Sequence, residues 1–249
     1  MLALIQKVSY IVKGYIVNNI HYKEEVFVMK SVKVNYKKLF FYIIVLLAIF
    51  SWLECFASDK KSYKVTWVDD GDTVVMSNGQ RVRYIGINTP EVAHKDQKAE
   101  PFGNKASEYN KTLVLNLKVE LERGKKQFDR YGRMLGYLFL KDGTFVNARL
   151  LKKGYAYCLY VKPNVKYAKL FLETQQEAMK KRVGIWHKFR ETGKTYIGNQ
   201  KSMRFHALTC PYGSKTGKRN RVRFSRKWEA FYKGYSPCKH CLGKEPLTE

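Results

Sequence analysis

Alternation of apolar and polar side chains begins near residue 63 and predicts a strand-rich first half of the chain. Residues 63–68 and 73–76 alternate as two strands, and residues 81–87 alternate as a third. The Asn-Gly pair at Asn78 lies between the second and third strands and is a strong hairpin signal. Three strands joined by tight turns favour a meander that curls toward a small barrel.

Helical and extended patterns alternate in the region that follows. The apolar spacing predicts helices over 104–117, 145–153 and 167–182 and extended segments over 118–123, 133–140 and 155–161. The resulting order, β-β-β-α-β-β-α-β-α, is typical of an α+β protein. Five core strands with three helices favour a five-stranded OB-fold-type β-barrel.

An apolar run over residues 39–53 has the surroundings of a secretory signal. Four lysines precede it, and small residues follow up to Ala57, after which a signal peptidase would cut. The run is shorter than the roughly 20 residues of a membrane-spanning helix, although an uncleaved membrane anchor remains the alternative. We therefore expect residues 1–57 to be an N-terminal extension with a signal peptide, with Met29 as an alternative start. The protein is expected to be secreted.

Positive charge dominates the composition. Lysine and arginine outnumber aspartate and glutamate by 47 to 21, and the formal net charge is +26. This excess favours an anionic partner such as nucleic acid, anionic lipid or an acidic polymer. A solvated lysine-rich surface without a specific partner is the alternative. The 249 residues allow one substantial core and a smaller module.

Three short polar clusters combine carboxylates with arginines. They are Asp-Asp-Gly-Asp-Thr at 69–73, Arg-Tyr-Ile-Gly-Ile-Asn-Thr-Pro-Glu at 83–91 and Asp-Arg-Tyr-Gly-Arg at 129–133. Carboxylates can hold a hard cation, and arginines can bind a phosphate through two parallel hydrogen bonds. This combination is what phosphodiester cleavage requires.

The region over 63–186 resembles the thermonuclease family, whose best-known member is staphylococcal nuclease. The resemblance rests on the three clusters, in their order and spacing, together with Lys-Pro-Asn at 162–164 and a closing Gly-Ile-Trp at 184–186. It implies a calcium-dependent endonuclease that cleaves DNA and RNA and leaves 3′-phosphate ends.

The resemblance assigns calcium binding and proton transfer to four residues. It implies Asp72, Asn88 and the main-chain carbonyl of Thr89 as Ca²⁺ ligands, and Glu91 as the general base that activates water. Relatives usually carry aspartate at the position of Asn88, so we expect weaker metal binding here. The alternative interpretations, which need no resemblance, are a turn-forming role for Asp72, a strand-end cap for Asn88 and a surface position for Glu91.

Substrate contacts are implied for three arginines and a tyrosine. Arg83 and Arg133 would contact the scissile phosphate and stabilise the charge that develops on it. Because Arg83 alternates with Arg81, one of the pair should face the site and the other solvent. Arg130 would bind a terminal phosphate. Among the tyrosines before Lys162, Tyr160 is our choice for base stacking, with a packing role as the alternative.

Three cysteines and a histidine near the C-terminus have the spacing of a metal site. His206-x3-Cys210 and Cys238-x2-Cys241 form two close pairs separated by a longer loop, a pattern that favours a closed structural Zn²⁺ site. A Cys238–Cys241 disulfide and His240 as the fourth ligand are the rival interpretations.

This C-terminal segment resembles the zinc domain of the Ada alkylation-repair protein. His206 stands where Ada carries its methyl-accepting cysteine, so no repair chemistry is expected. We assign residues 187–198 to a linker and residues 199–243 to an Ada-like zinc-binding module. A basic run over 215–227 with neighbouring aromatic residues favours contact with a nucleic-acid backbone.

The sequence therefore predicts a secreted, Ca²⁺-dependent endonuclease that acts on DNA and RNA with little sequence specificity. We expect a monomer without an obligate protein partner. Two alternatives remain at this level: a catalytically weakened nucleic-acid-binding protein, and a membrane-anchored nuclease for DNA uptake.

Overall fold

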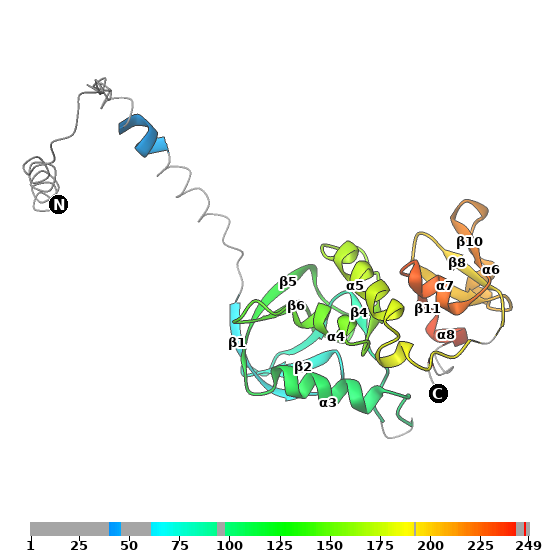
Figure 1. Ribbon diagram of the computed structural model, residues 1–249, viewed down its shortest axis with the longest axis horizontal. Coiled ribbons are helices and arrows are strands. Elements are labelled where there is room, and N and C mark those ends of the chain that lie inside the picture. The colour runs from blue at the N-terminus through cyan, green and yellow to red at the C-terminus, as the bar shows by residue number, and fades with distance from the viewer. Residues whose placement is uncertain (1–39, 46–60, 94–97, 192, 243–246, 248–249) are drawn as a thin grey trace, which may run out of the picture. The chain divides into compact units, whose positions relative to one another are not determined.

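Two compact units, 1–57 and 58–249, make up the chain in the computed structural model, which describes residues 40–45, 61–93, 98–191, 193–242 and 247 (Figure 1). The first unit contains a short helix over 40–45, and the remainder of the expected signal peptide lies outside the described residues. No helix in the described ranges has the length and apolar content needed to cross a membrane.

Five strands of the second unit close into a barrel in the order β1-β2-β3-β6-β5. They are β1 (Lys61–Val68), β2 (Thr73–Met76), β3 (Arg81–Tyr84), β5 (Lys118–Phe128) and β6 (Met134–Leu140). β3 and β6 are parallel, and the other neighbouring pairs are antiparallel. Inward-facing side chains form a fully buried core that includes Val65, Val74, Val82, Val119 and Leu138. The predicted α+β barrel is thus confirmed.

Three helices cover the barrel, as their apolar spacing predicts (Figure 1). They are α3 (Gly103–Val114), α4 (Val146–Lys152) and α5 (Ala168–Lys180). α3 packs against β1, α4 against β6 and α5 against α4. A 3₁₀ turn, η1 (Gly184–Trp186), ends this region and buries Trp186 completely.

The third predicted strand is divided in two. β3 ends at Tyr84, and a separate strand, β4 (Ile87–Asn88), pairs outside the barrel with β7 (Tyr157–Cys158). The division occurs at Gly86, which has φ = 81° and whose Cβ, if present, would lie 2.4 Å from the Phe171 ring. Only glycine fits this turn. The division brings Asn88 beside Tyr157.

The C-terminal part of the chain forms a second, four-stranded sheet in the order β10-β8-β9-β11. Its strands are β8 (Tyr196–Asn199), β9 (Arg204–Ala207), β10 (Arg221–Phe224) and β11 (Ser236–Pro237). Short helices lie between and after these strands, namely α6 (Pro211–Ser214), η2 (Lys218–Asn220), α7 (Lys227–Tyr232) and α8 (Lys239–Leu242). We call the segment from Tyr196 to Leu242 the C-terminal module.

The predicted linker over 187–198 extends too far, because its last three residues belong to β8. Tyr196 is fully buried, and Gly198 lies against the Phe224 ring, which a Cβ would approach to 2.4 Å. This glycine therefore serves close packing within a sheet rather than chain flexibility, and the module begins near Tyr196.

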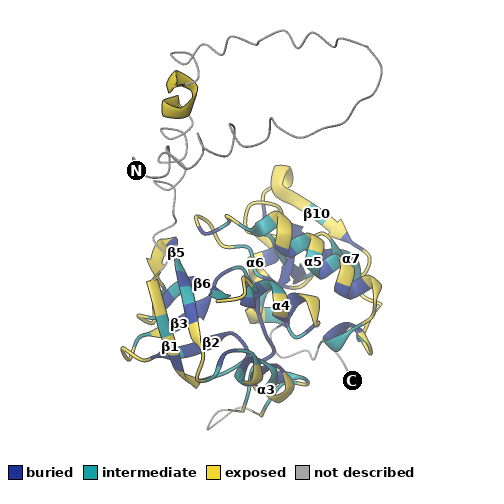
Figure 2. Cartoon of the chain, turned by 60° about the vertical axis from the view of Figure 1, so that its left-hand side comes forward, coloured by how far each residue is buried: buried dark blue, intermediate teal, exposed yellow. Residues whose placement is uncertain are grey.

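The C-terminal module packs directly on the barrel domain through a shared apolar core. Phe231 of α7 contacts the rings of Tyr157 and Trp186, with centroid distances of 5.4 and 5.3 Å. The buried Gln175 side chain donates from Nε2 to the Phe231 carbonyl at 2.5 Å. Buried residues, drawn dark blue in Figure 2, occur in both parts.

Candidate active site

Asp72, Arg83 and Asn88 form one buried hydrogen-bonded group at the end of the barrel strands. Arg83 Nη2 lies 3.0 Å from Asp72 Oδ2 and donates to Asn88 Oδ1 at 3.0 Å. Arg83 Nη1 donates to the carbonyls of Tyr84 and Ile87 at 2.8 and 3.1 Å. The structure therefore brings together residues from the first two polar clusters.

The other arginine of β3, Arg81, faces solvent as expected, although strand alternation is not the reason. Arg81 pairs with Asp69 at 2.7 Å, and its side chain is 58% exposed, against 11% for Arg83. A β-strand sends successive side chains to opposite faces, so residues two apart would share a face in a regular strand. Their different surroundings instead follow from the partners that each guanidinium finds, Asp69 for one and Asp72 for the other.

Asp72 is held inside the turn that joins β1 and β2. Its Oδ2 accepts a hydrogen bond from the Thr89 N–H at 2.8 Å, and its own N–H donates to Asp70 Oδ1 at 2.8 Å. The turn approaches Thr89 so closely that a Cβ on Gly71 would lie 2.7 Å from Thr89 Oγ1. Burial raises the pKa of Asp72 to about 7, although the Arg83 guanidinium opposes the shift. Bound positive charge at this carboxylate would relieve that penalty.

Arg133 from the third cluster joins the same group through a hydroxyl. Its Nη1 donates to Thr73 Oγ1 at 3.4 Å, and Thr73 Oγ1 in turn donates to Asp72 Oδ1 at 3.3 Å. Arg133 Nε is held by Asp129 Oδ2 at 2.8 Å. The three clusters, separate in sequence, thus form one continuous network.

Both arginines of the third cluster contact the ring of an exposed tyrosine. Arg130 and Arg133 lie over the Tyr131 ring, with guanidinium-to-centroid distances of 4.7 and 5.5 Å. Tyr131 is 67% exposed, and Arg130 also contacts its hydroxyl at 2.5 Å. The motif alone indicated Arg130 and not Tyr131, although it places this aromatic residue between the two arginines.

Glu91 lies at the edge of this network, with its backbone held by a second glutamate. Its N–H donates to Glu100 Oε2 at 3.0 Å, and its carbonyl accepts from the Glu100 N–H at 2.9 Å. Burial raises the pKa of Glu100 above its ordinary value. The Glu91 carboxylate itself contacts Lys239 of the C-terminal module, with Oε1 3.2 Å from Nζ. Neither Glu100 nor Lys239 was predicted from the sequence as part of the site.

Asn88 uses both ends of its amide. While Oδ1 accepts from Arg83, Nδ2 donates to the Thr89 carbonyl and to the Tyr157 hydroxyl, each at 2.9 Å. These partners fix the orientation of the amide because its oxygen must face a donor and its nitrogen an acceptor. Asn88 is therefore part of the buried network rather than a strand-end cap.

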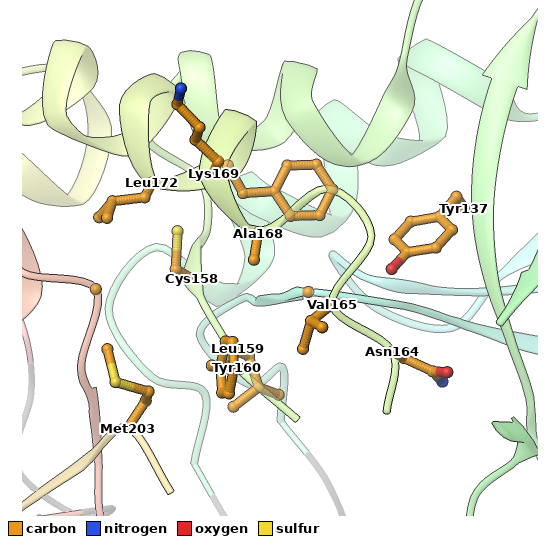
Figure 3. A pocket seen from close by; sticks show the side chains of 13 residues that line it. Tyr137, Cys158, Leu159, Tyr160, Asn164, Val165, Ala168, Lys169, Leu172 and Met203 are labelled. Carbon is orange, nitrogen blue, oxygen red and sulfur yellow. The ribbon is translucent and has the colours of Figure 1, made fainter. Parts of the chain in front are cut away.

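Tyr160 lies in a different environment from the polar network. It lines a largely apolar cavity of about 280 Å³ together with Cys158, Ala168 and Met203 (Figure 3). Met203 comes from the C-terminal module, so the cavity forms where the module meets the barrel domain. Tyr160 is half-buried there, and its assignment to base stacking stays a prediction.

His206, Cys210, Cys238 and Cys241 come together in the C-terminal module. One ligand atom from each lies within 4.8 Å of all the others. Zn–S bonds of about 2.3 Å place tetrahedral ligand atoms roughly 3.8 Å apart, so the four residues fit such an ion with small movements. Burial and the nearby Arg204 charge lower the pKa of His206, which favours the neutral imidazole that binds metals.

Neither rival interpretation of this cluster is found in the structure. The His240 ring packs against Tyr212, with centroids 4.9 Å apart, and it is His206 that belongs to the cluster. Cys238 and Cys241 are free thiols in the described part of the chain. We call the four residues the Cys/His cluster.

Several basic side chains of the C-terminal module are exposed. Arg221 and Arg223 on β10 are exposed, as are Lys215, Lys218 and Arg219 before it. Lys227, which the sequence places in the same basic run, is instead 2% exposed. The exposed residues of the basic run therefore lie on β10, in the loop that precedes it and, at Arg226, directly after it.

Comparison with known proteins identifies relatives of the barrel domain. The model of a family described as staphylococcal nuclease homologue matches residues 81–188. The thermonuclease of Staphylococcus intermedius is 40% identical over 131 residues, covering 51% of this chain and 77% of that protein. The thermonuclease of Staphylococcus hyicus is 37% identical over 132 residues, covering 52% and 78%. Endonuclease YncB of Bacillus subtilis is 42% identical over 124 residues, covering 48% and 58%.

Proposed function

The chain belongs to the staphylococcal nuclease family and is a nuclease, and we propose that it is a Ca²⁺-dependent endonuclease acting on DNA and RNA with little sequence specificity. The observation that carries the proposal is the continuous network of Asp72, Arg83, Asn88, Thr73 and Arg133. It places a buried carboxylate beside two guanidinium groups. That is the charge arrangement that binding and cleaving a phosphodiester requires.

Asp72, Asn88 and the Thr89 carbonyl would hold the calcium ion. All three offer oxygen atoms, which Ca²⁺ prefers. Burial raises the pKa of the Asp72 carboxyl, which shows that Arg83 offsets its negative charge only in part. A bound cation would offset the rest of that charge. When bound, the ion supplies positive charge next to the phosphate. Because Asn88 is uncharged, we expect binding weaker than in relatives with an acid at this position.

Glu91 would accept a proton from the attacking water. Its carboxylate is partly exposed, with a side-chain exposure of 33%, so water reaches it. Its backbone is fixed on both sides by Glu100, which limits the positions that the carboxylate can take. A base held at one place near a solvent-accessible phosphate is suited to proton abstraction.

Arg83 and Arg133 would bind the phosphate and stabilise the charge that builds up on it. Each of them already has a carboxylate partner, Asp72 for Arg83 and Asp129 for Arg133, so each guanidinium is pre-oriented. A guanidinium carries five N–H donors, and Arg83 makes four contacts in the structure. A phosphate must therefore approach through the remaining donor or replace a partner. Arg130 would bind a terminal phosphate, and Tyr160 a base or sugar.

Zn²⁺ in the Cys/His cluster would stabilise the C-terminal module. Four ligands leave no open coordination position, so the role is structural rather than catalytic. The similarity to the Ada zinc domain stays part of this proposal. The exposed basic residues around β10 would hold the nucleic acid by its phosphates, with affinity that falls steeply as salt rises.

We further propose that the protein is secreted through the signal peptide within residues 1–57 and acts as a monomer. Retention as a membrane-anchored nuclease is the alternative. Fractionation of expressing cells tests the choice: activity in the medium with a mature N-terminus near Ser58 supports secretion, and activity confined to the membrane fraction contradicts it.

Plasmid degradation tests the chemistry. The purified protein should cut in Ca²⁺, stop in EGTA and recover when calcium is added back. Glu91→Gln should lose most of this activity, whereas Glu108→Gln, an exposed glutamate on α3 that pairs with Lys111, should retain it. Undiminished cutting by Glu91→Gln would refute the assigned base. If the wild-type protein does not cut and Asn88→Asp does, the result would favour a catalytically weakened nucleic-acid-binding protein.

A further inference from the structure

Lys239 is the point at which the C-terminal module reaches the nuclease site. It begins α8, directly after Cys238 and two residues before Cys241, so two members of the Cys/His cluster flank it in sequence. Its ammonium lies 3.2 Å from Glu91 Oε1, across a separation of 148 residues. Neither the barrel nor the module could build this contact alone.

The position of Lys239 depends on the cluster because α8 is too short to be stable by itself. It spans four residues, and isolated helices of this length do not persist in water. The chain around it is held instead by the Cys238 N–H, which donates to the Phe205 carbonyl at 2.9 Å, and by Cys241 Sγ, which accepts from the Ala207 N–H at 3.4 Å. Both anchors lie on β9, the strand that also carries His206.

The module is docked firmly enough to transmit this position to the barrel. Besides the Gln175 contact, Gln176 Nε2 donates to the Tyr232 carbonyl at 2.8 Å, and Glu191 Oε1 accepts from the Trp228 N–H at 2.7 Å. These bonds and the shared aromatic core fix the module beside the site. It is therefore part of the nuclease rather than a freely tethered domain.

We propose that Lys239 is a positioning residue for Glu91, and that metal in the Cys/His cluster holds it there. The ammonium fixes Oε1 and leaves Oε2 to receive the proton of the attacking water. The proposal deepens the nuclease function and rests on Glu91 as the base. When the cluster loses its metal, α8 loosens, Lys239 leaves Glu91, and turnover falls although the barrel stays folded.

Zero-length cross-linking tests the contact without any measurement of activity. A carbodiimide joins a carboxylate and an amine only when they touch, so it should link Glu91 to Lys239 in the zinc-loaded protein. Glu91 is the only side-chain carboxylate in tryptic peptide 84–95, and a linked Lys239 resists trypsin within peptide 234–244. Mass spectrometry should therefore find these two peptides joined. The product should disappear after zinc is chelated and return with added Zn²⁺, with metal content measured in each sample.

Kinetics of matched variants test the consequence for the reaction. Lys239→Ala should lower kcat about fivefold with little change in KM, since an exposed ion pair changes an equilibrium by up to about this factor. Lys239→Arg should recover most of the loss. Lys201→Ala removes the same charge from an exposed position of the same module, outside the basic run over 215–227, and should leave kcat unchanged.

Two outcomes would overturn the proposal: a Glu91–Lys239 product that persists after zinc removal, or Lys239→Ala kinetics that match those of Lys201→Ala. If chelation unfolds the protein, the kinetics of the zinc-loaded Lys239→Ala variant still test whether Lys239 positions Glu91. The cross-link does not require Glu91 to act as a base. Cutting by Glu91→Gln would thus refute the catalytic assignment while leaving the metal-dependent contact to be judged separately.

Discussion

Arg83 Nη2 lies 3.0 Å from Asp72 Oδ2, so the cation assigned to the phosphate is already paired with the carboxylate assigned to calcium. Both side chains are nearly buried, with exposures of 11% and 6%. Each of the two charges therefore lowers the cost of burying the other. Binding of calcium at Asp72 would weaken this pair and make the guanidinium available to the substrate.

The role of Arg83 can be tested by a change that keeps its charge. Arg83→Lys should lower kcat about 100-fold, because an ammonium cannot make the four directed contacts of the guanidinium. Arg81→Lys on the same strand is the matched control and should stay within about twofold of the wild type. Steady-state cleavage of a short DNA substrate provides the comparison, and equal losses in the two variants would contradict the assignment.

The raised pKa of Asp72 predicts a pH-dependent stability without calcium. The folded pKa is about 7 and the ordinary value is 3.8, so the folded protein binds the proton more tightly. The contribution of Asp72 to the free energy of unfolding is complete below about pH 4 and is lost as pH rises through 7, by roughly 4 kcal/mol in all. Urea unfolding in EGTA between pH 4 and 8 should show this slope, and Asp72→Asn should flatten it. Parallel curves would contradict the prediction.

Asn88→Asp should raise the calcium affinity and lower the stability of the calcium-free protein. The added charge should tighten calcium binding about tenfold, because ligand charge sets affinity at oxygen-based sites. Without calcium, the new carboxylate faces the Thr89 carbonyl that Nδ2 now binds, and unfolding should become about 1 to 3 kcal/mol easier. Calorimetric titration and urea unfolding measure the two effects. Asn78→Asp adds the same charge in an exposed turn and should change neither.

Tyr157→Phe isolates the hydroxyl that supports Asn88. The ring would still pack on Phe231, but the 2.9 Å bond to Asn88 Nδ2 would be lost. We expect a loss of about 1 kcal/mol in the free energy of unfolding and weaker calcium activation. Tyr155→Phe is the control, since Tyr155 stacks on Tyr109 instead. An unchanged calcium midpoint in Tyr157→Phe would show that this hydroxyl does not support the site.

Local patterns were enough for most of the barrel but not for its details. Strands and helices follow from periods of two and 3.6 residues, which any short window reveals. The split at Gly86 did not follow, because it depends on Phe171, a ring more than eighty residues away. Gly198 was predicted to be part of a linker for the same kind of reason. A glycine is needed there because of the Phe224 ring, and local spacing does not show that contact.

The sequence by itself determined the barrel, the three polar clusters and the four residues of the Cys/His cluster, since each depends on spacing within a short stretch. Only the tertiary structure decided how these parts meet. Tyr157 reaches Asn88 across 69 residues and Lys239 reaches Glu91 across 148. Such contacts form because a shared apolar core holds the module against the barrel, and local spacing carries no information about that packing.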